Sequence, residues 1–411
     1  MNQPGAHLVD VDGMPRRSHY HLVFAVLAGL LGMVAPTSTA AAAATAVVVL
    51  SPANGLAGSN TTLAASGFPR RTAARVTVGT SSFTLQTDRL GRVTQSIRIP
   101  QTATGDVAVT VTTSTSTATA RFHVSPAEPR FGVSTPGGPA AASELDEVTS
   151  LAGEAPSIVM FYRGFGADLD VRDLDAVAAR GATPLLTWEP YDWSQGVDQP
   201  EFALKRIESG QFDDYARRYA GALKSWGRPV MLRFAHEMNG NWYPWSEAVN
   251  GNATGDYVAA WRHLHDIFAA EGVKNVSWVW SPNVVYPGSL PLRGLYPGDA
   301  YVDIVGIDGY NWGTATTWHT WTPPAELFEP TLAEVKLLAP TKRLLIAETA
   351  STESGGDKGI WIQELFTWLH TRPEIEAVVW FDHLKETDWR IGSSTTSARS
   401  FKEALATRRL A

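Results

Sequence analysis

The sequence predicts an α/β protein in which an all-β sandwich precedes a (β/α)8 TIM barrel. Composition changes along the chain, because all 15 tryptophans lie at or beyond Trp188 and residues 47–124 contain no Trp, Tyr or Lys. That early region consists of short alternating stretches separated by turn residues. From Arg130 onward, apolar strand-like segments alternate with amphipathic ones, which is typical of βα units.

The overall composition narrows the classes of protein to be considered. A chain of 411 residues predicts two or three structural units, and 44% hydrophobic with 18% charged residues permits a sizeable core. The net charge of −7 argues against nucleic acid and against anionic membrane surfaces as partners. Since the chain has no cysteine, disulfides, thiolate catalysis and cysteine metal sites are excluded.

Residues 1–45 have the features of an export signal. Arg16 and Arg17 supply positive charge before the apolar run at 22–34, and small residues at 38–41 offer a cleavage site. The run is short for a bilayer span, although an uncleaved anchor is the alternative interpretation. The protein is therefore expected to be secreted or held at the cell surface.

Residues 46–125 are predicted to form a small β-sandwich. Seven short strands are expected, at 46–50, 61–65, 74–78, 82–86, 91–99, 107–112 and 118–124. The pattern resembles bacterial immunoglobulin-like modules that accompany secreted enzymes. With no exposed aromatic platform in evidence, we favour a spacer or cell-wall contact over sugar binding. Residues 126–130 are interpreted as a stiff linker.

Residues 131–411 are predicted to form the barrel. Eight strands are expected, at 131–134, 157–162, 183–188, 229–234, 276–280, 304–310, 343–348 and 377–381. Helices are expected at 213–226, 257–271, 331–338, 360–369 and 401–406. A doubly wound open sheet is the competing fold, but it requires a glycine-rich phosphate loop, and Gly137-Gly138 is too brief for one.

Acidic and aromatic residues gather at the predicted strand ends. Active-site residues of TIM barrels sit at the carboxyl ends of the strands. Glu237 follows the fourth strand, Glu348 ends the seventh, and these strands lie across the barrel mouth from each other. A carboxyl group among flat rings suits sugar cleavage, since the acid moves protons and the rings stack on the apolar faces of pyranoses.

Four segments of the chain together resemble glycoside hydrolase family 26, best known for endo-β-mannanases. They read RFAHEMNGNWYPW, VGIDGYN, LLIAETAS and VVWFDHLKETDWRI. The resemblance extends from about Arg130 to the end of the chain. It implies a retaining mechanism with Glu237 as acid/base and Glu348 as nucleophile, which requires carboxyl groups about 5–5.5 Å apart.

The resemblance also implies supporting and sugar-binding residues. Arg233 and Tyr310 are expected to hydrogen-bond the nucleophile, and His236 to orient the acid/base and the substrate. Glu189 is a third carboxylate at the barrel mouth, which either binds sugar hydroxyls or pairs with Arg163. Trp242 and Trp380 match family aromatics that line the sugar sites. Trp188, Glu189, Trp280 and Asn283 are further candidate sugar contacts because of their places at the strand ends, and Glu189 departs from the histidine that mannan-cleaving relatives often carry there.

Structural ion pairs, metal sites and a serine nucleophile fit these residues less well than a glycosidase site does. Each glutamate taken alone could be a structural ion-pair partner. A zinc motif beginning at His236-Glu237 needs a second histidine at position 240, which is Gly240. The acidic residues at 168–175 lack the spacing of a calcium loop and are interpreted as a helix start. No serine elbow is present, and no metal or cofactor is expected.

The sequence therefore predicts a secreted, monomeric endo-β-glycosidase that hydrolyses β-mannan or glucomannan by double displacement. The same family includes enzymes acting on β-1,3-1,4-glucan and β-1,3-xylan, and both substrates stay open. A non-catalytic polysaccharide-binding protein is the rival from another class, which would not need both acids. An enzyme acting on the producer's own wall or capsule glycan is a third possibility.

Overall fold

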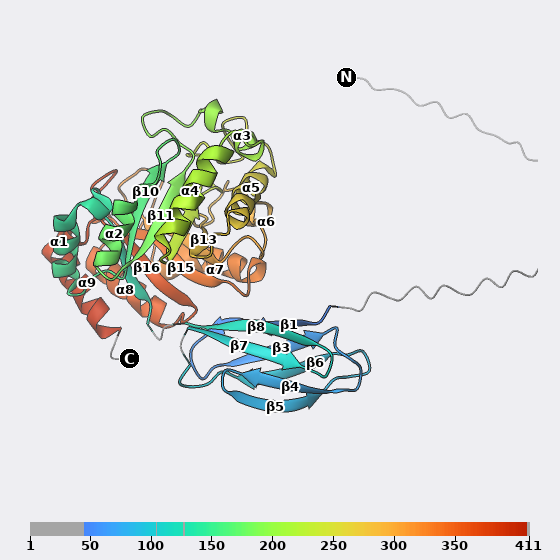
Figure 1. The fold of residues 1–411 in the computed structure, drawn as a ribbon. Coiled ribbons are helices and arrows are strands. Elements are labelled where there is room, and N and C mark those ends of the chain that lie inside the picture. The colour runs from blue at the N-terminus through green and yellow to red at the C-terminus, as the bar shows by residue number, and fades with distance from the viewer. Residues whose placement is uncertain (1–44, 104, 126–127, 409–411) are drawn as a thin grey trace, which may run out of the picture. The chain divides into compact units, whose positions relative to one another are not determined.

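The computed structural model describes residues 45–103, 105–125 and 128–408 (Figure 1). The predicted export signal at 1–45 lies outside this range, apart from its last residue. Within the described ranges, no helix is both long and apolar enough to cross a membrane.

The amino-terminal domain consists of two β-sheets. One sheet contains, in spatial order, β1 (Val47–Ser51), β3 (Asn60–Ser66) and β6 (Val93–Arg98). The other contains β2 (Asn54–Gly55), β8 (Thr117–Val124), β7 (Gly105–Thr112), β4 (Ala73–Val78) and β5 (Ser81–Gln86). All seven strands expected from the sequence are present, and the short β2 was not expected.

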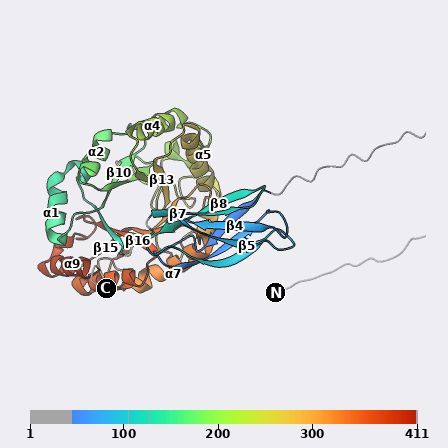
Figure 2. The same ribbon diagram turned by 60° about the horizontal axis from the view of Figure 1, so that its bottom comes forward.

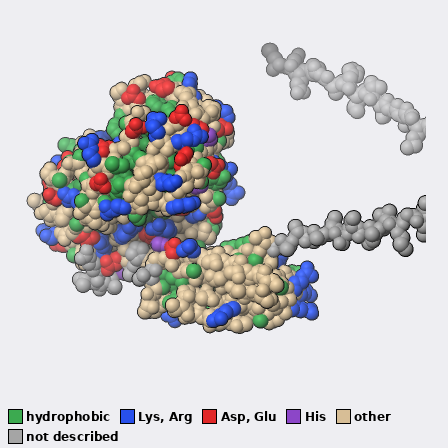
Figure 3. Space-filling view, in the orientation of Figure 1, with side chains coloured by type: hydrophobic (Ala, Val, Ile, Leu, Met, Phe, Trp, Pro, Cys, Tyr) green, Lys and Arg blue, Asp and Glu red, His purple; other side chains and the backbone are tan. Residues whose placement is uncertain are grey.

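Alternation along these strands creates the core of the domain. Every second residue of β3 is buried, and the buried set from both sheets forms one cluster that includes Leu63, Val76, Val109 and Phe122. The intervening Thr, Ser and Ala side chains face solvent, so the visible face of the domain carries few charges (Figure 3). A half-buried, pleated surface favours the β-branched Val and Thr residues of this segment.

The second domain is a closed barrel of eight parallel strands, as the sequence predicts. Its strands pair in chain order and the last pairs with the first. They are β9 (Arg130–Ser134), β10 (Ile158–Gly164), β11 (Thr183–Glu189), β12 (Val230–Phe234), β13 (Val276–Trp280), β14 (Ile304–Asn311), β15 (Arg343–Ser351) and β16 (Ile375–Phe381).

Helices surround the ring of strands (Figure 2). They are α1 (Ala142–Ala152), α2 (Val171–Ala179), α3 (Leu204–Glu208), α4 (Asp213–Trp226), α5 (Asp256–Ala270), α6 (Leu292–Leu295), α7 (Pro324–Leu338), α8 (Lys358–His370) and α9 (Thr395–Thr407). The helix predicted at 331–338 begins seven residues earlier in the structure, because α7 continues through Pro330.

The pleat of the barrel strands separates two layers of core. Alternate residues point into the barrel, where Ile158, Leu185 and Val279 belong to a central cluster. The residues between them point outward and pack against the helices, as Leu186 and Trp188 of β11 do. This alternation decides which side chain at each strand end can reach the barrel mouth.

Candidate active site

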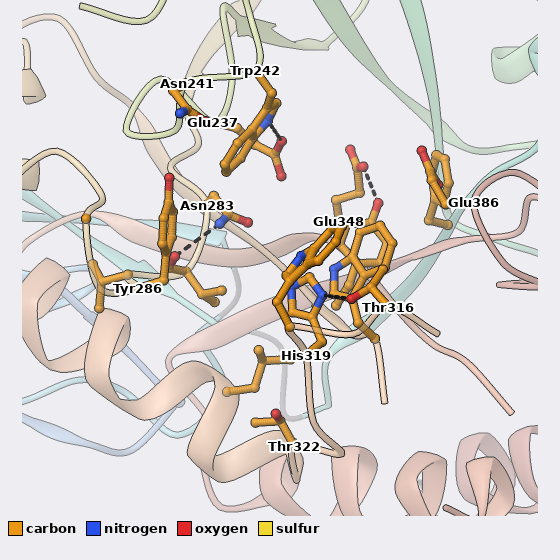
Figure 4. Close-up of a pocket in the computed structure, with 18 of the residues that line it drawn as sticks. Glu237, Asn241, Trp242, Asn283, Tyr286, Thr316, His319, Thr322, Glu348 and Glu386 are labelled. Atoms are coloured by element: carbon orange, nitrogen blue, oxygen red, sulfur yellow. Dashed lines mark hydrogen bonds between the residues drawn. The ribbon is translucent and has the colours of Figure 1, made fainter. Parts of the chain in front are cut away.

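Glu237 and Glu348 line one cavity at the carboxyl ends of the barrel strands (Figure 4). The cavity has a volume of about 970 Å³. Glu237 follows β12 and Glu348 belongs to β15, so the site draws on opposite sides of the barrel. In Figure 4, Asn283 and Tyr286 lie on the Glu237 side of Glu348, and Glu386 lies on the other side.

The turn after β12 holds Glu237 in an unusual backbone conformation. Ala235 has φ 45° and Glu237 has φ 53°, in the left-handed region that residues with a side chain seldom adopt. The Glu237 amide donates to the Ser281 carbonyl at 2.7 Å, and the Ala235 amide donates to the Trp188 carbonyl at 3.0 Å. Strained backbone of this kind concentrates at functional sites, where the surrounding contacts maintain it.

Glu237 is buried and retains its proton near neutral pH. Its Oε2 accepts a hydrogen bond from Trp242 Nε1 at 2.8 Å. Burial raises the pKa of Glu237 to about 7, and the negative charge of Glu348 adds to the rise. An acid with this pKa can deliver a proton to a leaving group at neutral pH.

Glu348 has the opposite electrostatic environment. Its Oε2 accepts from Arg233 Nη2 at 2.5 Å and from the Tyr162 hydroxyl at 2.9 Å, and its Oε1 accepts from Tyr310. Burial alone would raise the pKa of Glu348, but the Arg233 charge and the hydrogen bonds hold it below its usual value. Glu348 is therefore a carboxylate from its own lowered pKa upward, and up to about pH 7 Glu237 is still protonated beside it.

Arg233 is fully buried and pairs with two carboxyl groups on neighbouring strands, Asp308 of β14 and Glu348 of β15. It donates to Asp308 Oδ2 at 2.8 Å and through Nε to Thr187 Oγ1 at 2.9 Å, in addition to Glu348. The Asp308 carboxylate also accepts from Ser281 Oγ at 2.9 Å. This network fixes the Arg233 guanidinium against Glu348. Burial raises the pKa of Asp308 well above its usual value.

Sequence reasoning missed Tyr162 and Asp308, although a signal for both was available. Ile158, Met160 and Tyr162 are two residues apart on β10, and the first two point into the barrel. The same spacing joins Asp308 to Tyr310 on β14, so each polar side chain continues an inward-facing row to the barrel mouth. Burial raises the pKa of the Tyr162 and Tyr310 hydroxyls well above the usual value, so both stay protonated donors.

His236 is buried beside the acid/base candidate. Its ring centroid lies 4.9 Å from that of Tyr243 and 5.7 Å from that of Trp245. Burial lowers the pKa of His236 well below its usual value, so the ring is neutral. Its Nδ1 has no hydrogen-bond partner in the described part of the chain and lies 3.9 Å from Glu189 Oε1.

Glu189 ends β11 and accepts a hydrogen bond from Trp193 Nε1 at 2.8 Å. Burial raises the pKa of Glu189 to about 8, so it is a neutral acid at pH 7. The alternative that it pairs with Arg163 is wrong, because Arg163 forms its ion pair with Asp173. Glu189 and His236 are thus buried, uncharged polar neighbours at the ends of β11 and β12.

The predicted sugar contacts divide into two groups. Trp242 and Asn283 line the cavity. Trp188, Trp280 and Trp380 do not, and their placement corrects the prediction. All three belong to the core between strands and helices, where Trp188 stacks on Tyr219 with centroids 4.7 Å apart. The reason is the pleat, because each tryptophan occupies an outward-facing position of its strand.

Several lining residues were not expected from the sequence. Phe381, one residue beyond Trp380, faces the cavity from β16. Glu326 and Leu327 belong to α7. Many others come from loops, whose positions have no periodic signal, among them Tyr286, Trp312, Trp318, His319, Lys385 and Trp389.

In the described part of the chain, no group of three or more His, Asp or Glu side chains is arranged to hold a metal ion. The acidic stretch at 168–175 has structural partners instead. Asp170 caps α2 by accepting from the Arg172 amide, and Asp175 accepts from Trp226 Nε1 at 2.8 Å.

Comparison with known proteins extends the resemblance seen in the sequence. The family model described as glycosyl hydrolase family 26 matches residues 186–336. Endoglucanase H of Acetivibrio thermocellus is 39% identical over 272 residues, which are 64% of this chain and 29% of that protein. A mannan endo-1,4-beta-mannosidase of Bacillus subtilis strain 168 is 32% identical over 204 residues, 41% of this chain and 54% of that protein. The chain therefore spans about half or less of the length of these two relatives.

Solved structures with the same fold include two catalytic domains. That of the GH26 endo-beta-1,4-mannanase of Bacillus sp. JAMB-750 gives a TM-score of 0.52 at 19% identity, covering 68% of this chain and 86% of that one. The GH26 domain of an endo-beta-mannanase/endo-beta-glucanase from Prevotella bryantii gives 0.50 at 17% identity, covering 68% and 89%. At these identities the likeness shows the barrel fold.

Proposed function

We propose that this chain is a retaining endo-β-glycosidase of the glycoside hydrolase family 26 type, acting on β-mannan or glucomannan. One observation carries the proposal. Two buried glutamates line the same cavity, and their surroundings give one a raised pKa and the other a lowered pKa. Environments that separate two carboxyl pKa values in this way assign the acid and the nucleophile.

In the first step, a Glu348 oxygen attacks the anomeric carbon while the Glu237 proton passes to the glycosidic oxygen. The bond between that carbon and oxygen breaks, and the leaving chain departs with a hydroxyl group. Arg233, Tyr162 and Tyr310 hold the carboxylate in place for the attack. The product is an ester between Glu348 and the sugar.

In the second step, Glu237 acts as a base. Formation of the ester removes the negative charge of Glu348, which is the second cause of the raised Glu237 pKa. The pKa of Glu237 then falls, and the carboxylate takes a proton from water as the water oxygen attacks the anomeric carbon. Glu348 leaves as a carboxylate, and the configuration of the sugar is retained.

β-Glucan is the second candidate substrate. It is favoured by Endoglucanase H, which has a higher identity over a longer stretch than the mannosidase. Mannose and glucose units differ in the orientation of one hydroxyl, so the choice depends on a few hydrogen bonds. We propose that Glu189 and the unpartnered Nδ1 of His236 contribute to this choice by binding sugar hydroxyls.

The test of activity is a screen of the purified protein on mannan, galactomannan, lichenan, β-1,3-xylan and wall preparations, with product sizes recorded. Oligomeric products are expected, because the cavity is lined by several loops and accommodates a chain. The Glu348→Ala variant should lose hydrolysis and keep sugar binding. Wild-type-like hydrolysis by this variant would overturn the mechanism, whereas binding without hydrolysis by the wild type would indicate a non-catalytic binding protein.

We also propose export of the protein, on the basis of the charged and apolar segments within residues 1–45. A secreted enzyme meets polysaccharides outside the cell, which agrees with the proposed substrate class. The amino-terminal domain is then a spacer or a wall-contact module. Fractionation of the producing cells, with sequencing of the mature amino terminus, distinguishes a cleaved signal from a retained anchor.

A further inference from the structure

Four exposed aromatic rings occupy four successive loops at the mouth of the barrel. They are Trp193 after β11, Trp242 after β12, Tyr286 after β13 and Trp318 after β14, with exposed fractions of 55%, 39%, 36% and 79%. Trp242 and Tyr286 have their ring centroids 5.9 Å apart. Trp318 is the most exposed of the four, and none of the chemistry above uses it.

The loop that carries Trp318 is held at both ends. The Asn311 Oδ1 accepts from the Gly313 amide at 3.2 Å and from the Thr322 amide at 2.9 Å. Within the loop, the His319 ring stacks on Trp312 with centroids 5.1 Å apart and an interplanar angle of 8°. The Thr316 hydroxyl and His319 Nδ1 are 2.6 Å apart. These contacts order the loop, so Trp318 is presented to solvent by a rigid support.

Trp318 shares the cavity of the two catalytic glutamates. Trp242 and Tyr286 line the same cavity, whereas Glu189 and Trp193 are not among its lining residues. Since Glu237 must reach the glycosidic oxygen, the departing sugar lies on the Glu237 side of Glu348, where Asn283 and Tyr286 are found (Figure 4). The cavity extends to both sides of Glu348, since Glu386 also lines it, and the loop of Trp318 after β14 is next in order around the barrel to the loop of Tyr286 after β13.

We propose that Trp318 is an outer sugar-binding platform for the leaving-group part of the substrate chain. The inference depends on the proposed glycosidase function and adds a subsite to it. The indole face stacks on the apolar face of a pyranose several units from the cleaved bond, and the preordered loop lowers the entropic cost of binding. An ordered, largely exposed indole beside a catalytic cavity has apolar area to bury against such a sugar.

The experiment compares Trp318→Ala, Trp318→Phe and the control Leu337→Ala, which removes an exposed apolar side chain from α7. Substrates are the polysaccharide that the wild type cleaves, its reducing-end-labelled oligosaccharides, and an aryl glycoside whose leaving group is only the aryl ring. Trp318→Ala should raise KM for the polymer and long oligosaccharides by about three- to tenfold, as the loss of one stacking contact implies. It should also move the favoured cleavage position along labelled oligosaccharides.

Three readouts separate this role from a merely structural one. Hydrolysis of the aryl glycoside should not change in Trp318→Ala, Trp318→Phe should recover part of the lost affinity, and Leu337→Ala should match the wild type. If the wild type cleaves polymer and Trp318→Ala gives the same KM and products, the subsite is refuted while the glycosidase function stands. If the wild type cleaves none of the glycans, both fall.

Discussion

At the residue scale, the position of Arg233 gives two chemically identical side chains, Glu237 and Glu348, different protonation states. Its guanidinium contacts Glu348 and Asp308, and it is fully buried, so its charge is little screened by water. Among the described residues, the Trp242 indole alone donates a hydrogen bond to the Glu237 carboxyl group. Burial therefore keeps the proton on Glu237, and the guanidinium keeps the charge on Glu348.

The pH dependence of kcat/KM follows from these two environments. The active form has Glu348 ionised and Glu237 protonated, so kcat/KM should fall as pH rises through about 7, where Glu237 loses its proton. On the acid side it should fall only below the usual carboxyl range, because the pKa of Glu348 is lowered. A profile measured on a soluble oligosaccharide tests this, and activity that still increases from pH 7 to pH 9 would contradict it.

Glu237→Ala should affect the two chemical steps unequally. An aryl glycoside with a good leaving group needs little protonation, so the glycosyl-enzyme should still form and then accumulate, because the base for water is missing. The measurement is a burst of released phenol followed by slow turnover, with mass spectrometry of the trapped ester. Absence of the burst, or its appearance in Glu348→Ala instead, would reverse the two assignments.

At the element scale, the pleat of a strand decides what each residue can contact. Trp380 and Phe381 are neighbours on β16, yet the first packs among helix residues and the second lines the cavity. Trp380 was predicted as a sugar contact because the family resemblance implied it and because it lies near the end of its strand. The face of the sheet on which Trp380 lies depends on which residues of β16 point inward. A shift of one residue would exchange the inward and outward positions.

Lys358 of helix α8 supports the segment at 388–393, which contributes to the lining of the cavity. It lies at the start of α8, fully buried, and donates to the Asp388 and Arg390 carbonyls at 3.2 and 2.8 Å and to Ser393 Oγ at 2.9 Å. Burial lowers the pKa of Lys358 to about 8. The segment that it binds includes Trp389, which lines the cavity.

Lys358→Met should destabilise the protein by about 1–3 kcal/mol, because it leaves buried acceptors without their donor. It should also lower kcat/KM as the segment around Trp389 loses its support. Urea unfolding and kinetics on one oligosaccharide measure the two effects. Lys205→Met, at an exposed lysine paired with Glu208, is the control and should change neither. Unchanged unfolding of the Lys358 variant would refute this structural role.

At the scale of the whole molecule, the two-sheet domain and the barrel each have their own hydrophobic core. The two-sheet domain has its own buried cluster, and the barrel has a central cluster and an outer one. The residues assigned to catalysis all belong to the barrel. The amino-terminal domain is thus expected to influence where the enzyme acts and not how it cleaves.

Removal of residues 1–127 should leave kcat/KM on soluble oligosaccharides unchanged. Binding to insoluble cell-wall material should decrease if the two-sheet domain is a wall-contact module, and should stay constant if it is a spacer. Pull-down with washed walls and parallel kinetics measure both properties. A loss of activity on soluble substrates, with the barrel still folded by circular dichroism, would contradict a purely accessory role.

The sequence by itself determined the barrel, the sheet domain and the two glutamates, because those depend on local patterns. Strand periodicity, helix periodicity and the residues that follow each strand are all readable within short windows. The family 26 resemblance rested on four such windows, and the family-model match at residues 186–336 includes two of them. The helix start predicted at 168–175 corresponds to α2, whereas α1, α3 and α6 were found only in the structure.

Only the tertiary structure decided which side chains surround each glutamate. The contact of Arg233 with Glu348 joins residues 115 positions apart, and Tyr162 reaches the same carboxylate across 186 positions. Closing the barrel brings these groups together, while the pleat turns Trp188, Trp280 and Trp380 away from the sugar. Long-range contacts and the phase of the pleat are set by how strands pair and pack, so no local pattern could specify the protonation of Glu237 or the aromatic lining of the cleft.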